Sequence, residues 1–196
     1  MPHLARGGLL AFAGLVVLMH VLRPGLDPAE RFVSEYGRGW TQPLMIAAFL
    51  AWAVGTAACV AVARRTGGER RVARGIVVAA LCVAALGLVV AAAFASQTVG
   101  GELPENVRRT TAGRLHDIGT LCILAGLLVA APASTRLLRS GRYRWTVAGL
   151  AVVLLGIVPV LVAVGADAPG IGQRGFILVG LAWQWAFVGS AAPRLR

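Results

Sequence analysis

Few side chains in this 196-residue chain have types that could carry chemistry. Eight of them form a candidate polar pocket, and they are His20, Arg23, Ser34, Glu35, Gln97, His116, Asp117 and Arg174. Two imidazoles with a carboxylate would suit a zinc ion that keeps an open position for water, and a pair of histidines would suit a haem. Two arginines would suit a lipid phosphate or carboxylate.

These chemistries differ in what they demand of the sequence. No HExxH-type spacing accompanies the histidines, and we expect no resident cofactor. A lipid contact through Arg23 and Arg174 needs only a bidentate cation at headgroup depth, so it is the interpretation that we favour. The structural alternative is that Arg23 or Arg174 pairs with Glu35 or Asp117 and only fastens a loop to the helices.

The composition indicates a membrane protein. Hydrophobic residues make up 58% of the chain, charged residues 14%, and the mean hydropathy is +0.76. That is more apolar surface than one soluble core could hide. It excludes a disordered chain, a disulfide scaffold and a nucleic-acid module, despite a net charge of +11. The three cysteines lie in apolar stretches, and we expect no disulfide.

Six apolar stretches are long enough to cross about 30 Å of hydrocarbon as helices. They are Leu4–Leu22, Pro43–Ala63, Ile76–Ala95, Leu115–Ala133, Trp145–Val164 and Gly172–Ala192. Only short connectors are left, so we expect one all-α domain over residues 1–196, a polytopic bundle of six transmembrane helices. No small-x-small cleavage pattern follows the first stretch, which we therefore expect to be an uncleaved helix and not a signal peptide.

The arginines predict the orientation. All 19 cationic side chains are arginine, and with the amino terminus inside, 12 of them lie in inner segments and seven in outer ones. Seven of the eight acidic residues fall on the outer side. Because basic connectors stay in the cytoplasm, we expect a multi-pass protein of the inner cell membrane with both termini cytoplasmic.

The first outer loop is predicted to contain a short helix. In the run Asp27–Glu30, the aspartate suits an N-cap, the proline the first helical position and the glutamate the reciprocal capping position. Phe32, Val33 and Tyr36 would form its apolar face, and Gly37 would end it.

On this topology the candidate residues share one side of the membrane. His20 ends the first helix, Gln97 follows the third, His116 and Asp117 begin the fourth, and Arg174 begins the sixth. They would rim a shallow outward pocket whose occupant is a membrane lipid or another amphiphile, bound or modified there. The alternatives are a structural or partner-binding membrane protein without catalysis and, more distantly, a haem/redox or transport protein.

Short motifs add a resemblance to a known family. The runs His20–Pro28, Ser34–Gly37, Gly113–Gly119 and Gly172–Gly175 resemble domain of unknown function 998, a family of bacterial and archaeal membrane proteins. The resemblance covers most of the chain, and its Leu-Arg-Pro, Ser-Glu and His-Asp-x-Gly elements are the most specific. It implies the six-helix layout and adds weight to the candidate residues without giving them a role.

A second resemblance is more distant. The order of Ser34-Glu35, Ser96-Gln97 and His116-Asp117 is similar to that in the eukaryotic FRAG/DRAM/SFK group of six-helix proteins. Those proteins are tied to lipid-anchor remodelling and autophagy, so the likeness implies a lipid-related role at the non-cytoplasmic face.

Overall fold

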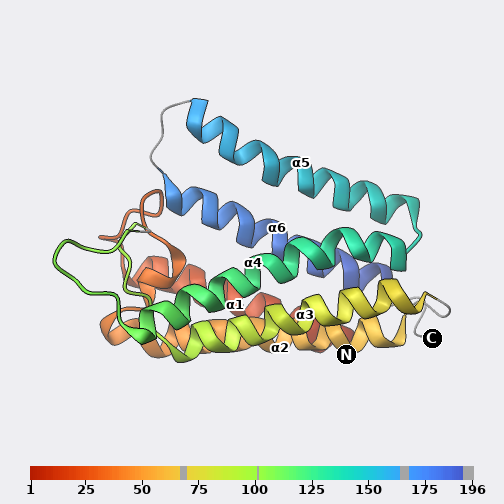
Figure 1. Cartoon of the computed structure of the whole chain (residues 1–196), viewed down its shortest axis with the longest axis horizontal. Coiled ribbons are helices and arrows are strands. Elements are labelled where there is room, and N and C mark those ends of the chain that lie inside the picture. The colour runs from red at the N-terminus through yellow and green to blue at the C-terminus, as the bar shows by residue number, and fades with distance from the viewer. Residues whose placement is uncertain (67–69, 101, 164–167, 192–196) are drawn as a thin grey trace.

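The computed structural model describes residues 1–66, 70–100, 102–163 and 168–191, and over these ranges the chain is all-α (Figure 1). Its six long helices are α1 (Pro2–Leu22), α2 (Gln42–Arg65), α3 (Arg71–Ala93), α4 (Thr111–Leu137), α5 (Gly141–Ala163) and α6 (Pro169–Ala191). Two 3-10 segments, η1 (Val33–Gly37) and η2 (Gly39–Thr41), lie between α1 and α2. The predicted helix ends Val164 and Ala192 lie outside the described residues.

Four of the long helices have the length and composition to cross a membrane. They cover Pro2–Leu22, Gly39–Arg65, Arg71–Ala93 and Thr111–Leu137, and they indicate a membrane-embedded protein. Several helices are longer than the apolar stretches from which they were predicted. For example, α3 begins at Arg71 and not at Ile76, because an arginine at a helix end can extend its charged head to the water while its stem stays along the helix.

Small residues bring the first four helices into close contact. A Cβ on Gly8 of α1 would lie 2.5 Å from the carbonyl oxygen of Ala51 in α2. Between α3 and α4, a Cβ on Gly87 would lie 2.5 Å from the carbonyl oxygen of Gly119. Such spacing leaves room only for glycine, the packing mode that membrane helices use where backbones must approach closely.

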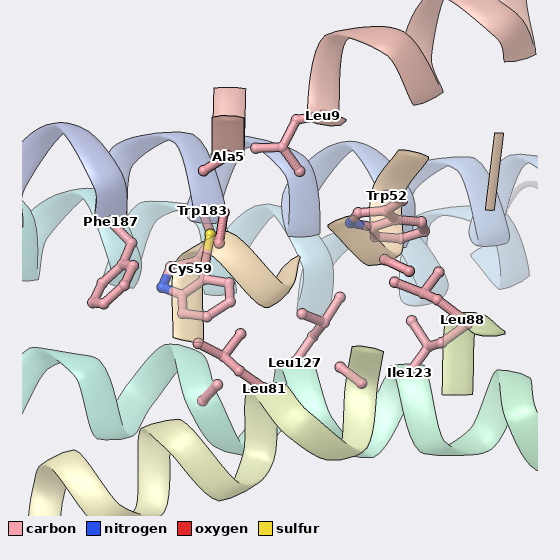
Figure 2. Close-up of a cluster of buried hydrophobic side chains, with 14 of the residues drawn as sticks. Ala5, Leu9, Trp52, Cys59, Leu81, Leu88, Ile123, Leu127, Trp183 and Phe187 are labelled. Atoms are coloured by element: carbon pink, nitrogen blue, oxygen red, sulfur yellow. The ribbon is translucent and has the colours of Figure 1, made fainter. Parts of the chain in front are cut away.

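The core lies where α2, α3, α4 and α6 face one another. Figure 2 shows Trp52 of α2 and Trp183 of α6 on opposite sides of Leu127 of α4. Two buried hydrogen bonds join α2 to α6 here: Trp52 Nε1 donates to Gln184 Oε1 at 3.0 Å, and Gln184 Nε2 donates to Thr56 Oγ1 at 3.1 Å. A fully buried glutamine is thus satisfied on both sides, which fixes the register of α6 against α2.

The helix α5 stands apart from the tight α1–α4 unit, and α6 lies between the two (Figure 1). The α3–α4, α1–α2 and α2–α3 pairs share long interfaces, whereas α4 touches α5 and α6 much less. This splayed arrangement leaves space along α4, which is described with the site below.

The short helix predicted after Asp27 is not confirmed at that start, since the first helical segment of this loop is the 3-10 helix η1, which begins at Val33. Asp27 Oδ1 accepts a hydrogen bond from the Ala29 nitrogen at 2.7 Å, and the Asp27 carbonyl accepts one from the Arg31 nitrogen at 2.9 Å, which closes a single turn. The chain then leaves the helical path, because the Val33 nitrogen donates to Gln173 Oε1 of α6 at 2.7 Å. A tertiary hydrogen bond has replaced the next helical one, and only the short η1 follows.

Candidate functional site

An arginine, an imidazole and a phenol stack where α1, η1 and α6 meet. Arg174 donates from Nη2 to His20 Nε2 at 2.8 Å, and its guanidinium carbon lies 5.5 Å from the centre of the Tyr36 ring. The His20 ring stacks on that same tyrosine with 4.1 Å between ring centres. Burial raises the pKa of the Tyr36 phenol, which donates to the Leu26 carbonyl oxygen at 2.7 Å.

This geometry determines which nitrogen of His20 donates a hydrogen bond and which accepts one. Because a guanidinium only donates, His20 Nε2 must accept, and Nδ1 must carry the proton that it gives to the Val16 carbonyl oxygen at 2.7 Å. Both ring nitrogens are engaged. His20 therefore has no free nitrogen with which to bind a metal ion or a haem.

The same arginine fastens α6 to the loop between α1 and α2. Its Nη1 donates to the carbonyl oxygen of Arg31 at 2.6 Å and to that of Gly170 at 3.0 Å. Four donated contacts thus go to His20 and to backbone carbonyls. The lipid phosphate that we expected at Arg174 would have to compete with all of them.

The start of α6 carries a glycine pattern that the sequence analysis did not use. Gly170–Gly175 has the spacing G-x-G-x-x-G, which in dinucleotide-binding folds follows a β-strand. Here the preceding element is the helix α5. The Gly170 nitrogen donates to the Ala29 carbonyl oxygen at 2.8 Å, and a Cβ would lie 2.5 Å from the carbonyl oxygens of Arg31 and Pro28. The first glycine of the pattern therefore serves loop packing.

Arg23 holds the same loop from its other end. Its Nη1 donates to the Arg38 carbonyl oxygen at 2.7 Å and to Thr41 Oγ1 at 3.2 Å. Arg38 in turn donates to the carbonyl oxygen of Thr98 in the loop between α3 and α4. The two long loops at this end of the bundle are thereby joined.

Glu35 is a carboxylate that is almost completely buried, with 3% of its surface exposed. Its Oε1 accepts from the Gly100 nitrogen at 2.8 Å, which makes a second link between the two loops. Its Oε2 lies 3.6 Å from Nη1 of Arg31 and has no hydrogen-bond partner in the described part of the chain. The ion pair keeps the buried charge compensated.

His116 holds the end of α3 against α4. It is 4% exposed, and its Nδ1 lies 2.8 Å from the Phe94 carbonyl oxygen and 3.2 Å from that of Ala91. Carbonyls at a helix C-terminus lack partners within the helix, and the imidazole N–H supplies one. These contacts tie two neighbouring helices together.

The start of α4 holds the last two candidates. Gln97 Oε1 accepts from the Thr110 nitrogen at 2.8 Å, just before the helix begins. Asp117 Oδ2 lies 2.9 Å from Arg109 Nη1, in an ion pair that is partly exposed. The pairings expected of Arg23 or Arg174 with Glu35 or Asp117 are not formed among the described residues, since the two arginines bind carbonyls, a hydroxyl and an imidazole.

The eight candidate residues therefore do not converge on one point. His20 and Arg174 touch, Arg23 and Glu35 hold loops, Ser34 and His116 line one small cavity, and Gln97 and Asp117 lie at the start of α4. No group of three or more His, Cys, Asp or Glu side chains spaced for a metal ion occurs in the part of the chain that the structure describes.

Three larger cavities occur among the described residues, and only one of them is lined by a predicted pocket residue, Ser34. A proximal cavity of about 360 Å³ lies between η1, α2, α4 and α6, and its lining includes Ser34, Trp52, Leu124, Pro169, Gln173 and Phe176. A distal cavity of about 230 Å³ lies between α4, α5 and α6, and its lining includes Leu128, Pro132, Leu155, Phe176 and Trp183. A polar cup of about 340 Å³ is lined by Glu30, Arg31, Val99, Gly100, Glu102 and Pro169.

Neighbouring cavities share a lining residue. Phe176 borders both the proximal and the distal cavity, and Pro169 borders both the proximal cavity and the polar cup. We call the two apolar cavities together the crevice. Its lining residues Leu124, Leu128 and Leu155 are 36%, 48% and 74% exposed, so the crevice is open on the side of the bundle.

A smaller cavity of about 20 Å³ lies beside His116 and Ser34, with Arg38 and Ser96 also in its lining. That volume matches a single water molecule. It is too small for an organic ligand, so the crevice and the cup are the spaces in which a larger molecule would fit.

Comparison with known proteins places the chain in a family. The family model described as "Protein of unknown function (DUF998)" matches residues 6–189. No curated protein and no solved structure matches the chain. Because the family model covers nearly the whole length, the chain belongs to the DUF998 family, whose function is unknown.

Proposed function

We propose that this protein is a six-helix protein of the inner membrane that binds a lipid or another amphiphile in the crevice along α4 and α6, with the headgroup in the polar cup. The observation that carries the proposal is that an apolar, side-opening space and a polar one adjoin at Pro169, which lines both. An amphiphile has the same arrangement, with an apolar chain that would lie in the crevice and a polar headgroup that would lie in the cup.

The dimensions support an acyl chain as the occupant. Along α6 the crevice extends from Pro169 to Trp183, which corresponds to about 21 Å of helix at 1.5 Å per residue. One leaflet of the hydrocarbon layer is about 15 Å deep, so a chain from one leaflet fits within the crevice. Its exposed leucines give such a chain a path in from the side.

The orientation rests on the arginine distribution. Arg6, Arg64, Arg71 and Arg136 belong to the helix ends opposite the two long loops (Figure 1). If this basic end is cytoplasmic, both termini are inside and the polar cup opens at the outer face. We extend the same topology to α5 and α6, which pair as an antiparallel hairpin and would supply the fifth and sixth spans.

A filling substitution tests the crevice. Leu124→Trp places a large ring in the proximal cavity, and we expect the purified protein to retain much less phospholipid, measured by native mass spectrometry from mild detergent. The matched control is Leu121→Trp on the same helix, because Leu121 is 61% exposed and lines neither cavity. Equal lipid retention by the two variants would contradict the proposal.

A structural role without ligand is the second candidate, and one observation favours it. Five polar side chains at this end form hydrogen bonds with backbone groups of neighbouring segments, and they are Arg23, Gln97, His116, Gln173 and Arg174. On this account the polar end only fastens loops, and a partner protein would use the bundle as a scaffold. Unchanged lipid retention in Leu124→Trp, together with a loss of stability in the fastening variants described below, would favour it.

A further inference from the structure

The polar cup offers a basis for headgroup selection, an inference that rests on the proposed function. Inside a bilayer, an acyl chain gains little by exchanging lipid neighbours for an apolar crevice, because lipid tails are as apolar as leucine. Discrimination between amphiphiles must then come mainly from the polar groups at the mouth of the crevice. In this chain those groups are the cup residues.

The cup carries more negative than positive charge. Arg31, the one cation in the described lining of the cup, lies 3.6 Å from the buried Glu35 carboxylate, so its charge is largely compensated. Glu30 and Glu102 are exposed, and neither has an ion-pair partner within 4.0 Å among the described residues. The rim therefore presents two free carboxylates around a compensated arginine.

Hydrogen bonds hold the backbone that carries Glu102 in place. Val99 and Glu102 form a bridge, with the Val99 nitrogen donating to the Glu102 carbonyl oxygen at 2.7 Å and the reverse bond at 3.2 Å. Gly100 begins the turn with a φ of +62°, a conformation that glycine adopts freely. Its nitrogen donates to Glu35, so the turn that carries Glu102 is fixed against the loop that carries Glu30 and Glu35.

We propose that the cup selects amphiphiles whose headgroup carries a protonated primary amine, such as ethanolamine phospholipids. Carboxylates only accept hydrogen bonds, and a primary ammonium offers three N–H donors and a positive charge. An anionic glycerol headgroup is repelled by Glu30 and Glu102. A trimethylated choline headgroup keeps the charge but has no N–H to donate. The headgroup phosphate then lies toward Arg31.

The test uses the full-length protein in lipid nanodiscs, with native mass spectrometry as the readout. Ethanolamine, choline and glycerol phospholipids with identical acyl chains are supplied in equal amounts. We expect preferential retention of the ethanolamine lipid, and in E30Q/E102Q a loss of about fivefold in that preference, the size of two exposed ion contacts. The control is E105Q, since Glu105 is an exposed acid of the same loop outside the cup.

The outcomes separate the two proposals. If the wild type retains all three lipids equally, while Leu124→Trp abolishes retention, the headgroup inference is overturned and the crevice proposal stands. If the wild type retains no lipid, the proposed function fails, and the headgroup inference fails with it. An equal loss of preference in E105Q and E30Q/E102Q would also overturn the inference, because it would reflect general surface charge.

Discussion

Replacing Arg174 by alanine should release the loop between α1 and α2 from α6. The guanidinium donates to His20 Nε2 at 2.8 Å and to the carbonyl oxygens of Arg31 and Gly170 at 2.6 and 3.0 Å. It also lies 5.5 Å from the centre of the Tyr36 ring. Arg174→Ala removes every one of these interactions and leaves three acceptors without this donor.

The size of the effect follows from the hydrogen bonds that the substitution removes. A hydrogen bond from a charged donor contributes about 1.5–3 kcal/mol. The sum over three such bonds is an upper bound on the loss of stability. The measured loss should be smaller, because the arginine is only partly buried and water can hydrogen-bond to the acceptors that it leaves. We therefore expect Arg174→Ala to lower the free energy of unfolding by about 3 kcal/mol. Arg174→Lys should recover less than half of that, because one ammonium cannot span the imidazole and both carbonyls.

The assay is denaturant-induced unfolding in mild detergent, with protease cleavage in residues 23–41 as a local readout. The control is Arg109→Ala, which breaks a partly exposed ion pair with Asp117 and should cost at most about 1 kcal/mol. If Arg174→Ala stayed within about 0.5 kcal/mol of the wild type and the loop stayed protected, Arg174 would not be a fastening residue. Its guanidinium would then be available for a ligand after all.

Three further predictions concern packing, pH and the buried polar core. Gly87→Ala should cost about 2 kcal/mol in thermal unfolding, because its Cβ would lie 2.5 Å from the Gly119 carbonyl oxygen, whereas Gly75→Ala on the same helix meets open space and should be neutral or stabilising. Burial raises the pKa of Tyr36 above 10.0, so the folded chain holds the phenolic proton more tightly than the unfolded chain does. The stability that the protonated phenol contributes is complete below pH 10.0 and is lost as the pH rises further. Tyr36→Phe should remove this pH dependence of the free energy of unfolding. Gln184→Leu should destabilise by about 2 kcal/mol in denaturant titration, since it leaves the Trp52 indole N–H without its buried acceptor, and equal stability would contradict this reasoning.

The helices were predictable because one local property determines them. A run of about 20 apolar residues forms a helix in a bilayer whatever it packs against, and the six predicted stretches correspond to α1–α6. The ends were less predictable, as at Arg71, where a charged residue continues the helix beyond the apolar run. Within the residues that the structure describes, four helices meet the length and composition needed to span a membrane.

The site was less predictable because its partners are backbone groups. Charges and side-chain types predict ion pairs, yet Arg23 and Arg174 donate to carbonyls that no composition argument can locate. The start of the loop helix differs from the predicted one for the same reason, since the Val33 nitrogen bonds to Gln173 across 140 residues of sequence. The crevice depends on how far α5 and α6 stand from α4, and that spacing has no local signature.

Tryptophan quenching by brominated acyl chains tests the central claim most directly. Trp52 and Trp183 line the crevice and are each 2% exposed to the outside, whereas Trp40, Trp145 and Trp185 are 65%, 80% and 40% exposed. The measurement therefore uses a variant in which those three exposed tryptophans are phenylalanine, reconstituted in vesicles with or without brominated chains. Our account predicts strong quenching of the two buried indoles. Emission unchanged by bromination would contradict it, because no acyl chain would then occupy the crevice.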